Sequence, residues 1–186
     1  LYEENFSDKY GINFNTQKTI LVTGHRRESF GKGFENICNA IKHIAINNSV
    51  QVIYPVHLNP KVQEPVNRIL GDLPSVHLIP PQEYVPFIFL MKKAHIILTD
   101  SGGVQEEAPS LGKPVLVMRD TTERPEGVEA GTARLIGTVT KTIISQVELL
   151  LVDSAEYNKM AKAVNPYGDG SASEKIYNFI LSKHQK

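Results

Sequence analysis

The chain has 186 residues, 41% of them hydrophobic, so it is long enough to bury one core without disulfides or metals. Lys and Arg number 20, as do Asp and Glu, and a formal net charge of zero argues against nucleic-acid binding or a polybasic membrane patch. No segment approaches the roughly 18 apolar residues of a membrane span, and the single Cys38 allows no intrachain disulfide, so we expect a soluble, cytoplasmic protein.

The polar segment 1–18 precedes the first apolar run, and we interpret it as a lead-in or interdomain linker. Beyond it, in residues 19–186, short aliphatic runs alternate with helical patterns of about 12 to 18 residues, which indicates βαβ units. The runs are continuously apolar, as expected for parallel strands buried on both faces. The predicted strands are 19–22, 50–56, 76–79, 95–99, 114–118 and 134–136. The predicted helices are 33–47, 61–70, 83–93, 104–111, 141–151, 155–163 and 171–183.

Six strands joined by right-handed crossovers predict a doubly wound, Rossmann-like α/β domain with a parallel sheet. Turn-forming residues at 165–170 interrupt the helical pattern near the end of the chain. The helix beyond them is amphipathic, with Ile176, Phe179 and Ile180 as its apolar residues. We expect this final helix to pack on this domain or on another one.

Chemically interesting residues follow the predicted strands, at the sheet edge where open α/β sheets bind ligands. After strand 95–99 comes Ser101-Gly102-Gly103, where glycines let backbone N–H groups approach a ligand and the helix dipole favours an anion. A diphosphate would suit this position. The alternative is that Ser101 only caps the helix and that the glycines only turn the chain.

Two charged or titratable residues near this edge are further candidates. Glu107 lies one helical turn beyond the glycines and could accept hydrogen bonds from ribose hydroxyls, or it could be a solvated first-turn residue. His25 is followed by Arg26 and Arg27, which make an electropositive setting suited to an anionic leaving group, although loop histidines are commonly just solvated.

Cofactor and metal sites are not expected. His57 lies at the end of strand 50–56, but no Cys, His or carboxylate spacing supports a metal site with His25. The run Gly31-Lys32-Gly33 lacks the third glycine of a dinucleotide fingerprint, and the chain has no Walker motif. NAD and ATP are therefore disfavoured.

Several long motifs occur in one order along the chain: Thr23–Glu28, Pro55–Pro60, Asp100–Pro109, Gly112–Arg119, Thr122–Gly127 and Asn165–Gly170. Together they resemble the C-terminal half of the non-hydrolysing UDP-N-acetylglucosamine 2-epimerases of bacteria. Those enzymes have two Rossmann-like domains in the GT-B arrangement, with the active site between them. The resemblance thus implies half of a two-domain enzyme whose N-terminal domain is absent from this chain, and which forms a homodimer at full length.

The resemblance also implies a reaction. The family interconverts UDP-N-acetylglucosamine and UDP-N-acetylmannosamine for polysaccharide biosynthesis, by elimination and re-addition of UDP through 2-acetamidoglucal and without a cofactor. By this match His25 assists departure and return of the UDP oxygen, and Ser101, Gly102 and Gly103 hold the diphosphate. The carboxylates that transfer protons lie in the absent half, so the isolated chain is expected to be inactive.

The remaining site residues are carried over from the same match. Arg124 serves the phosphate or the sugar, and Glu107 serves the ribose. Gln82 and Phe87 lie against the uracil, and His57 belongs to the nucleotide-sugar site or a regulatory site. Three alternatives stay open: the donor domain of a GT-B glycosyltransferase, a hydrolysing epimerase that releases free N-acetylmannosamine, and a UDP-sugar-binding module without turnover.

Overall fold

The computed structural model describes residues 2–184, in which six parallel strands form one sheet of order β3-β2-β1-β4-β5-β6. The strands are β1 (Lys18–Thr23), β2 (Val50–Pro55), β3 (Val76–Ile79), β4 (Ile96–Thr99), β5 (Val115–Val117) and β6 (Ala133–Leu135). The α-helices are α1 (Tyr2–Tyr10), α2 (Lys32–Asn47), α3 (Pro60–Leu70), α4 (Tyr84–Lys93), α5 (Gly102–Glu107), α6 (Pro125–Glu129), α7 (Thr140–Val152), α8 (Ser154–Ala161) and α9 (Ala172–His184). Two 3-10 helices are η1 (Arg27–Ser29) and η2 (Ala108–Leu111).

The strand order reverses direction between β1 and β4, which lie side by side although β2 and β3 come between them in the chain. Leu21 at the centre of β1 pairs with Ile53 of β2 and Ile97 of β4. The predicted doubly wound α/β fold with six parallel strands is therefore confirmed. Such a reversal leaves a crevice at the carboxyl ends of the two central strands, where ligands bind in folds of this type.

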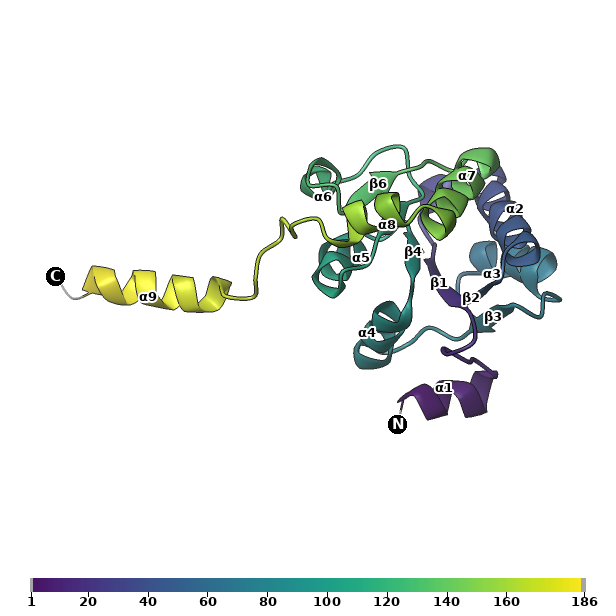
Figure 1. The fold of residues 1–186 in the computed structure, drawn as a ribbon, viewed down its shortest axis with the longest axis horizontal. Coiled ribbons are helices and arrows are strands. Elements are labelled where there is room, and N and C mark those ends of the chain that lie inside the picture. The colour runs from purple at the N-terminus through teal and green to yellow at the C-terminus, as the bar shows by residue number, and fades with distance from the viewer. Residues whose placement is uncertain (1, 185–186) are drawn as a thin grey trace.

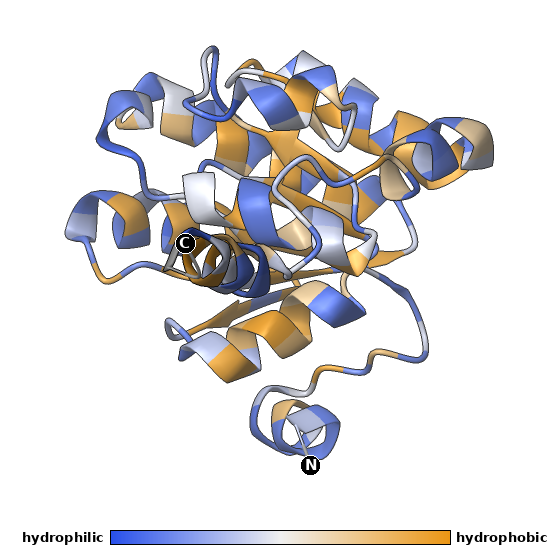
Figure 2. Cartoon of the chain, turned by 90° about the vertical axis from the view of Figure 1, so that its left-hand side faces the viewer, coloured by the Kyte–Doolittle hydropathy of each residue, from blue (hydrophilic) through white to orange (hydrophobic). Residues whose placement is uncertain are grey.

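Side chains that alternate along β1 belong to two cores, one on each face of the sheet. Ile20 and Val22 pack in the core that α2, α3, α7 and α8 cover, whereas Leu21 packs in the core beneath α1, α4 and α5. In Figures 1 and 2 these helices form layers on both sides of the strands. Both faces of the sheet are thus buried, which explains why the strands read as continuous apolar runs.

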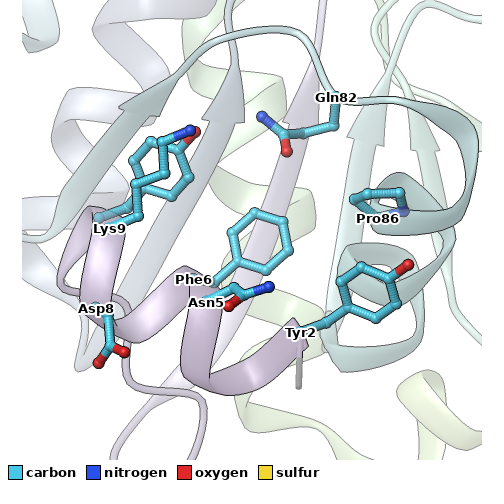
Figure 3. A pocket seen from close by; sticks show the side chains of 8 residues that line it. Tyr2, Asn5, Phe6, Asp8, Lys9, Gln82 and Pro86 are labelled. Carbon is cyan, nitrogen blue, oxygen red and sulfur yellow. The ribbon is translucent and has the colours of Figure 1, made fainter.

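The segment expected to be a lead-in holds a helix that packs on the domain. Phe6 of α1 is buried and stacks on Phe89 of α4 with ring centroids 5.8 Å apart, and Phe14 meets the same ring edge-on. Figure 3 shows the cavity of about 420 Å³ that α1 forms with Gln82 and Pro86. Residues before β1 therefore contribute to the second core.

Two further differences from the predicted helices have physical causes. The helix expected at 104–111 starts at Gly102 and changes to a 3-10 helix at Ala108, because Pro109 lacks the N–H that an α-helix needs. The amphipathic helix α9 projects away from the rest of the chain after an extended segment (Figure 1). Its apolar side chains are therefore exposed and pack against no other element among the described residues. No described helix is long and apolar enough to cross a membrane.

Candidate functional site

The loops that follow β1 and β4 are joined at the carboxyl edge of the sheet. The hydroxyl oxygens of Thr23 and Thr99, the last residues of the two strands, are 2.6 Å apart. The backbone N–H of Ser101 donates to the Thr99 hydroxyl oxygen at 3.0 Å, and that of Asp100 donates to the Thr23 carbonyl at 3.1 Å. This hydrogen bonding fixes the start of α5 relative to the His25 loop.

A cavity of about 220 Å³ lies at this edge and brings together five of the nine predicted site residues. They come from the loops after β1, β2, β3 and β4 and from α4. Residues far apart in sequence thus meet at the carboxyl edge of the sheet, where open α/β sheets bind ligands. These five residues are His25, His57, Gln82, Phe87 and Ser101.

The imidazoles of His25 and His57 stack with centroids 5.0 Å apart and planes 8° from parallel. His57 Nδ1 accepts a hydrogen bond from the backbone N–H of Asn59 at 3.1 Å, which places the proton of the neutral His57 ring on Nε2. The His25 side chain is 44% exposed. Both rings therefore present polar groups to the cavity, and no cluster of three His, Cys, Asp or Glu in residues 2–184 is arranged to hold a metal.

Two guanidinium groups converge over Gly102, the first residue of α5. A Cβ built on Gly102 would lie 3.8 Å from Cζ of Arg124 and 4.0 Å from Nη2 of Arg26. Ser101 is the N-cap residue of α5, but its hydroxyl makes no capping hydrogen bond with the helix, so that hydroxyl is available to a ligand. Because the first amides of a helix have no acceptor within it, N–H groups and guanidinium groups together can bind a phosphate here.

Arg124 is held by contacts that the sequence did not predict. Its Nε forms an ion pair with the Glu106 carboxylate, and this hydrogen bond raises the pKa of Arg124 above its ordinary value. Its backbone N–H donates to the Thr122 hydroxyl, which itself donates to the buried Gln105 amide at 2.7 Å. The loop after β5 is thereby tied to α5.

Glu107 lies outside the lining of the 220 Å³ cavity, at the end of α5 facing the start of α4. A hydrogen bond between the Tyr84 hydroxyl and the Glu107 carboxylate raises the pKa of Tyr84. The residue expected to receive ribose hydroxyls is therefore engaged by a hydroxyl of the chain itself. Gly103 is exposed beside Ser101, and a Cβ added to Gly103 would have only the Ser101 hydroxyl oxygen nearby, at 4.0 Å.

Arg119, which also follows β5, has a structural role. Its buried guanidinium pairs with Glu28 at 2.5 Å and with Glu123 at 2.7 Å, joining the loops after β1 and β5. The hydrogen bond from Arg119 holds the pKa of Glu123 at about 2. With both carboxylates engaged, Arg119 is not available to a ligand phosphate.

Tyr167, in the motif at 165–170, supports the loop that carries Arg124. The Tyr167 hydroxyl accepts a hydrogen bond from the backbone N–H of Gly127 at 3.0 Å, at the start of α6. A Cβ on Gly127 would lie only 2.8 Å from that hydroxyl oxygen, so any larger residue would force the Tyr167 side chain to shift. Arg26 and Asp100 also belong to the site. Asp100 directly follows β4 and Arg26 is the third residue after β1, and this nearness to a buried strand is the sequence signal for both.

Comparison with known proteins identifies the family. A family model described as UDP-N-acetylglucosamine 2-epimerase matches residues 1–181. The UDP-N-acetylglucosamine 2-epimerase of Escherichia coli (strain K12) is 65% identical over 161 residues, which cover 86% of this chain and 43% of that protein. The crystal structure of UDP-GlcNAc 2-epimerase from Neisseria meningitidis bound to UDP-GlcNAc has a TM-score of 0.90 and 50% identity, covering 97% of this chain and 48% of that one.

The chain thus spans about half the length of the curated relatives it matches. The glycosyltransferase WaaG, involved in lipopolysaccharide biosynthesis, is only 20% identical but has a TM-score of 0.66 over half of its own chain, which shows a common fold. This likeness concerns the α/β fold alone, and the place of the chain as one half of a GT-B enzyme stays a prediction. With a family model matched over residues 1–181, the chain belongs to the UDP-N-acetylglucosamine 2-epimerase family.

Proposed function

We propose that this chain is the UDP-binding half of an enzyme that interconverts UDP-N-acetylglucosamine and UDP-N-acetylmannosamine. The observation that carries the proposal is the convergence of the Arg26 and Arg124 guanidinium groups over Gly102, beside a cavity that His25 lines. Two fixed cations at the start of a helix suit a diphosphate. The Neisseria relative, 50% identical, is described as bound to UDP-GlcNAc, which supports the same ligand here.

The parts of UDP have matching partners along the site. The diphosphate would lie over Gly102, accepting hydrogen bonds from the guanidinium groups, from the amides of Gly102 and Gly103, and from the Ser101 hydroxyl. The ribose hydroxyls would bind the Glu107 carboxylate in place of the Tyr84 hydroxyl. Three further residues that line the cavity are assigned to the uracil and the nucleotide sugar: Gln82, Phe87 and His57.

The proposed chemistry is an elimination followed by an addition, because C2 of the sugar carries no strongly acidic proton. A base removes that proton while the C1–O bond breaks, and the bonding electrons leave with the UDP oxygen. His25 stabilises the departing oxygen, which leaves UDP and 2-acetamidoglucal bound. A proton then reaches the other face of C2 and the UDP oxygen adds back to C1. We assign both proton transfers at C2 to groups outside this chain.

Helix α9 indicates where the rest of the protein would pack. Its apolar side chains are exposed, including Ile176 at 59% and Phe179 at 63%. Since the relatives are about twice as long, we propose that α9 packs on the N-terminal domain of the full-length enzyme. That domain would close the active site, and the full-length enzyme would form a homodimer. A nucleotide-sugar substrate and the buried, unpaired Cys38 favour a cytoplasmic enzyme.

Calorimetric titration of the chain with UDP tests the site. Arg124→Ala removes one of the two cations and is expected to weaken UDP binding roughly 10- to 100-fold, the effect of losing one or two charge-assisted hydrogen bonds. Arg68→Ala is the matched control, because Arg68 is an exposed arginine whose ion pairs are with Glu35 of α2 and Glu64 of α3. Absence of UDP binding by the unmodified chain would contradict the proposal.

Product analysis of the full-length protein with UDP-N-acetylglucosamine and no acceptor tests the reaction. UDP-N-acetylmannosamine is the expected product. Free N-acetylmannosamine would indicate the hydrolysing reaction instead, and turnover only after an acceptor is added would indicate a glycosyltransferase. UDP binding with no turnover under any of these conditions would indicate that the protein is a UDP-sugar-binding module without enzymatic activity.

A further inference from the structure

Asp100 is a fully buried carboxylate that holds the loop after β1 in place. Its Oδ2 accepts hydrogen bonds from the backbone N–H groups of His25 and Arg26, both at 2.7 Å. Its own backbone N–H donates to the carbonyl of Thr23. Asp100 therefore joins the end of β4 to the His25 loop at the point where the strand order of the sheet reverses.

The second oxygen of this carboxylate is in a different position. Asp100 Oδ1 is buried and accepts no hydrogen bond from any group in residues 2–184. It lies 3.7 Å from Nδ1 of His25, slightly beyond hydrogen-bond range. Because the His25 side chain is 44% exposed, the ring has room to rotate and close that distance, as catalytic hydrogen bonds commonly do once a ligand is bound.

The other titratable or charged groups around this site cannot take the place of Asp100. His57 stacks on the His25 ring and uses its own Nδ1 to accept from Asn59. Arg26 and Arg124 carry positive charges and converge over Gly102. The buried acceptor placed to receive a proton from His25 Nδ1 is thus the Asp100 oxygen that has no other partner among the described residues.

We propose that Asp100 is a positioning residue for His25, which receives the His25 Nδ1–H at Oδ1 and so directs Nε2 toward the UDP oxygen. This inference rests on the proposed function. As the C1–O bond breaks, its electron pair stays on the phosphate oxygen, which takes the proton from Nε2; on re-addition the proton returns to Nε2. The Asp100 carboxylate keeps this hydrogen bond throughout and stabilises the protonated imidazole, as carboxylates do in related pairs.

The substitution Asp100→Asn distinguishes the roles of the two carboxylate oxygens. The asparagine carbonyl can still accept from the His25 and Arg26 amides, whereas the NH₂ group cannot accept from Nδ1–H. In the full-length enzyme we expect kcat to fall roughly 10²- to 10³-fold while UDP affinity is retained. One limb of the kcat/KM pH profile should be absent from His25→Asn, which identifies it as the limb that depends on His25. In Asp100→Asn we expect this limb at lower pH. Asp72→Asn is the matched control, because Asp72 is exposed in the turn between α3 and β3, at the sheet edge opposite the site.

A measurement on the unmodified chain needs neither a variant nor turnover. Nitrogen NMR of the histidine-labelled chain saturated with UDP is expected to find the proton of the neutral His25 ring on Nδ1, because the contact with Asp100 Oδ1 closes once a ligand is bound. A proton on Nε2, or an Asp100→Asn enzyme with unchanged kcat and pH profile, would overturn the inference. If the full-length enzyme instead shows no epimerisation, the proposed function fails, and the NMR result still decides whether Asp100 binds His25.

Discussion

Replacement of Gly102 by alanine separates ligand binding from folding at the candidate phosphate site. Gly102 has no positive φ, so alanine can adopt its backbone conformation without strain. The added methyl group would have Arg124 Cζ at 3.8 Å and Arg26 Nη2 at 4.0 Å, which are ordinary van der Waals distances. The variant should therefore fold, and be as stable as the unmodified chain or more stable by about 0.4–1 kcal/mol.

The same methyl group fills the space between the two guanidinium groups. A phosphate oxygen must approach a guanidinium nitrogen to about 2.7–2.9 Å for a charge-assisted hydrogen bond, and the methyl would hold it away. Loss of one such bond, worth about 1.5–3 kcal/mol, should weaken UDP binding roughly 10- to 100-fold.

Calorimetry with UDP and thermal unfolding of the same sample measure both effects. Gly33→Ala serves as control, since Gly33 also lies in the first turn of a helix and its Cβ would meet only the Thr138 side chain, at 3.4 Å. Unchanged UDP affinity in Gly102→Ala would refute the placement of the phosphate. A loss of affinity that merely accompanies a lower melting temperature would refute the claim that the methyl acts on the ligand alone.

Three other predictions concern stability and reactivity. Gly127→Ala should lower the free energy of unfolding by about 1–3 kcal/mol through its 2.8 Å contact with the Tyr167 hydroxyl, and adding Tyr167→Phe should recover part of that loss in denaturant titrations. Burial lowers the pKa of His95 to about 4, so the free energy of unfolding should fall as the pH drops from about 6.5 to about 4, and less steeply in His95→Phe. Burial raises the pKa of the Cys38 thiol to about 12, so iodoacetamide should modify it only in denaturant.

The sheet could be predicted from sequence because both of its faces are buried. Runs such as Ile20–Val22 have no polar residue to interrupt them, so their positions in the chain locate the strands. Helix α1 lacks such a signal, since Phe6 is its only buried residue and the rings outside the helix that Phe6 contacts are Phe14 and Phe89. A helix held by partners that lie outside it, one of them on α4, cannot be recognised from its own periodicity.

The site was predictable to the extent that chain position determines it. Residues directly after buried strands must meet at the carboxyl edge of a parallel sheet, and His25 and Ser101 do so. Which atoms then pair is a property of the tertiary structure. The Asp100 carboxylate and the His25 loop are 75 residues apart, and nothing in either segment alone specifies their hydrogen bonds.

The two arginines after β5 illustrate this limit. Both Arg119 and Arg124 follow the same strand, so their positions in the sequence do not distinguish their roles. In the structure Arg119 is 4% exposed and neutralised by two carboxylates, whereas Arg124 is 36% exposed, has one carboxylate partner and points over Gly102. A buried arginine with two carboxylates has no charge left to offer a ligand, so removal of Arg119 should affect folding, and removal of Arg124 should affect UDP.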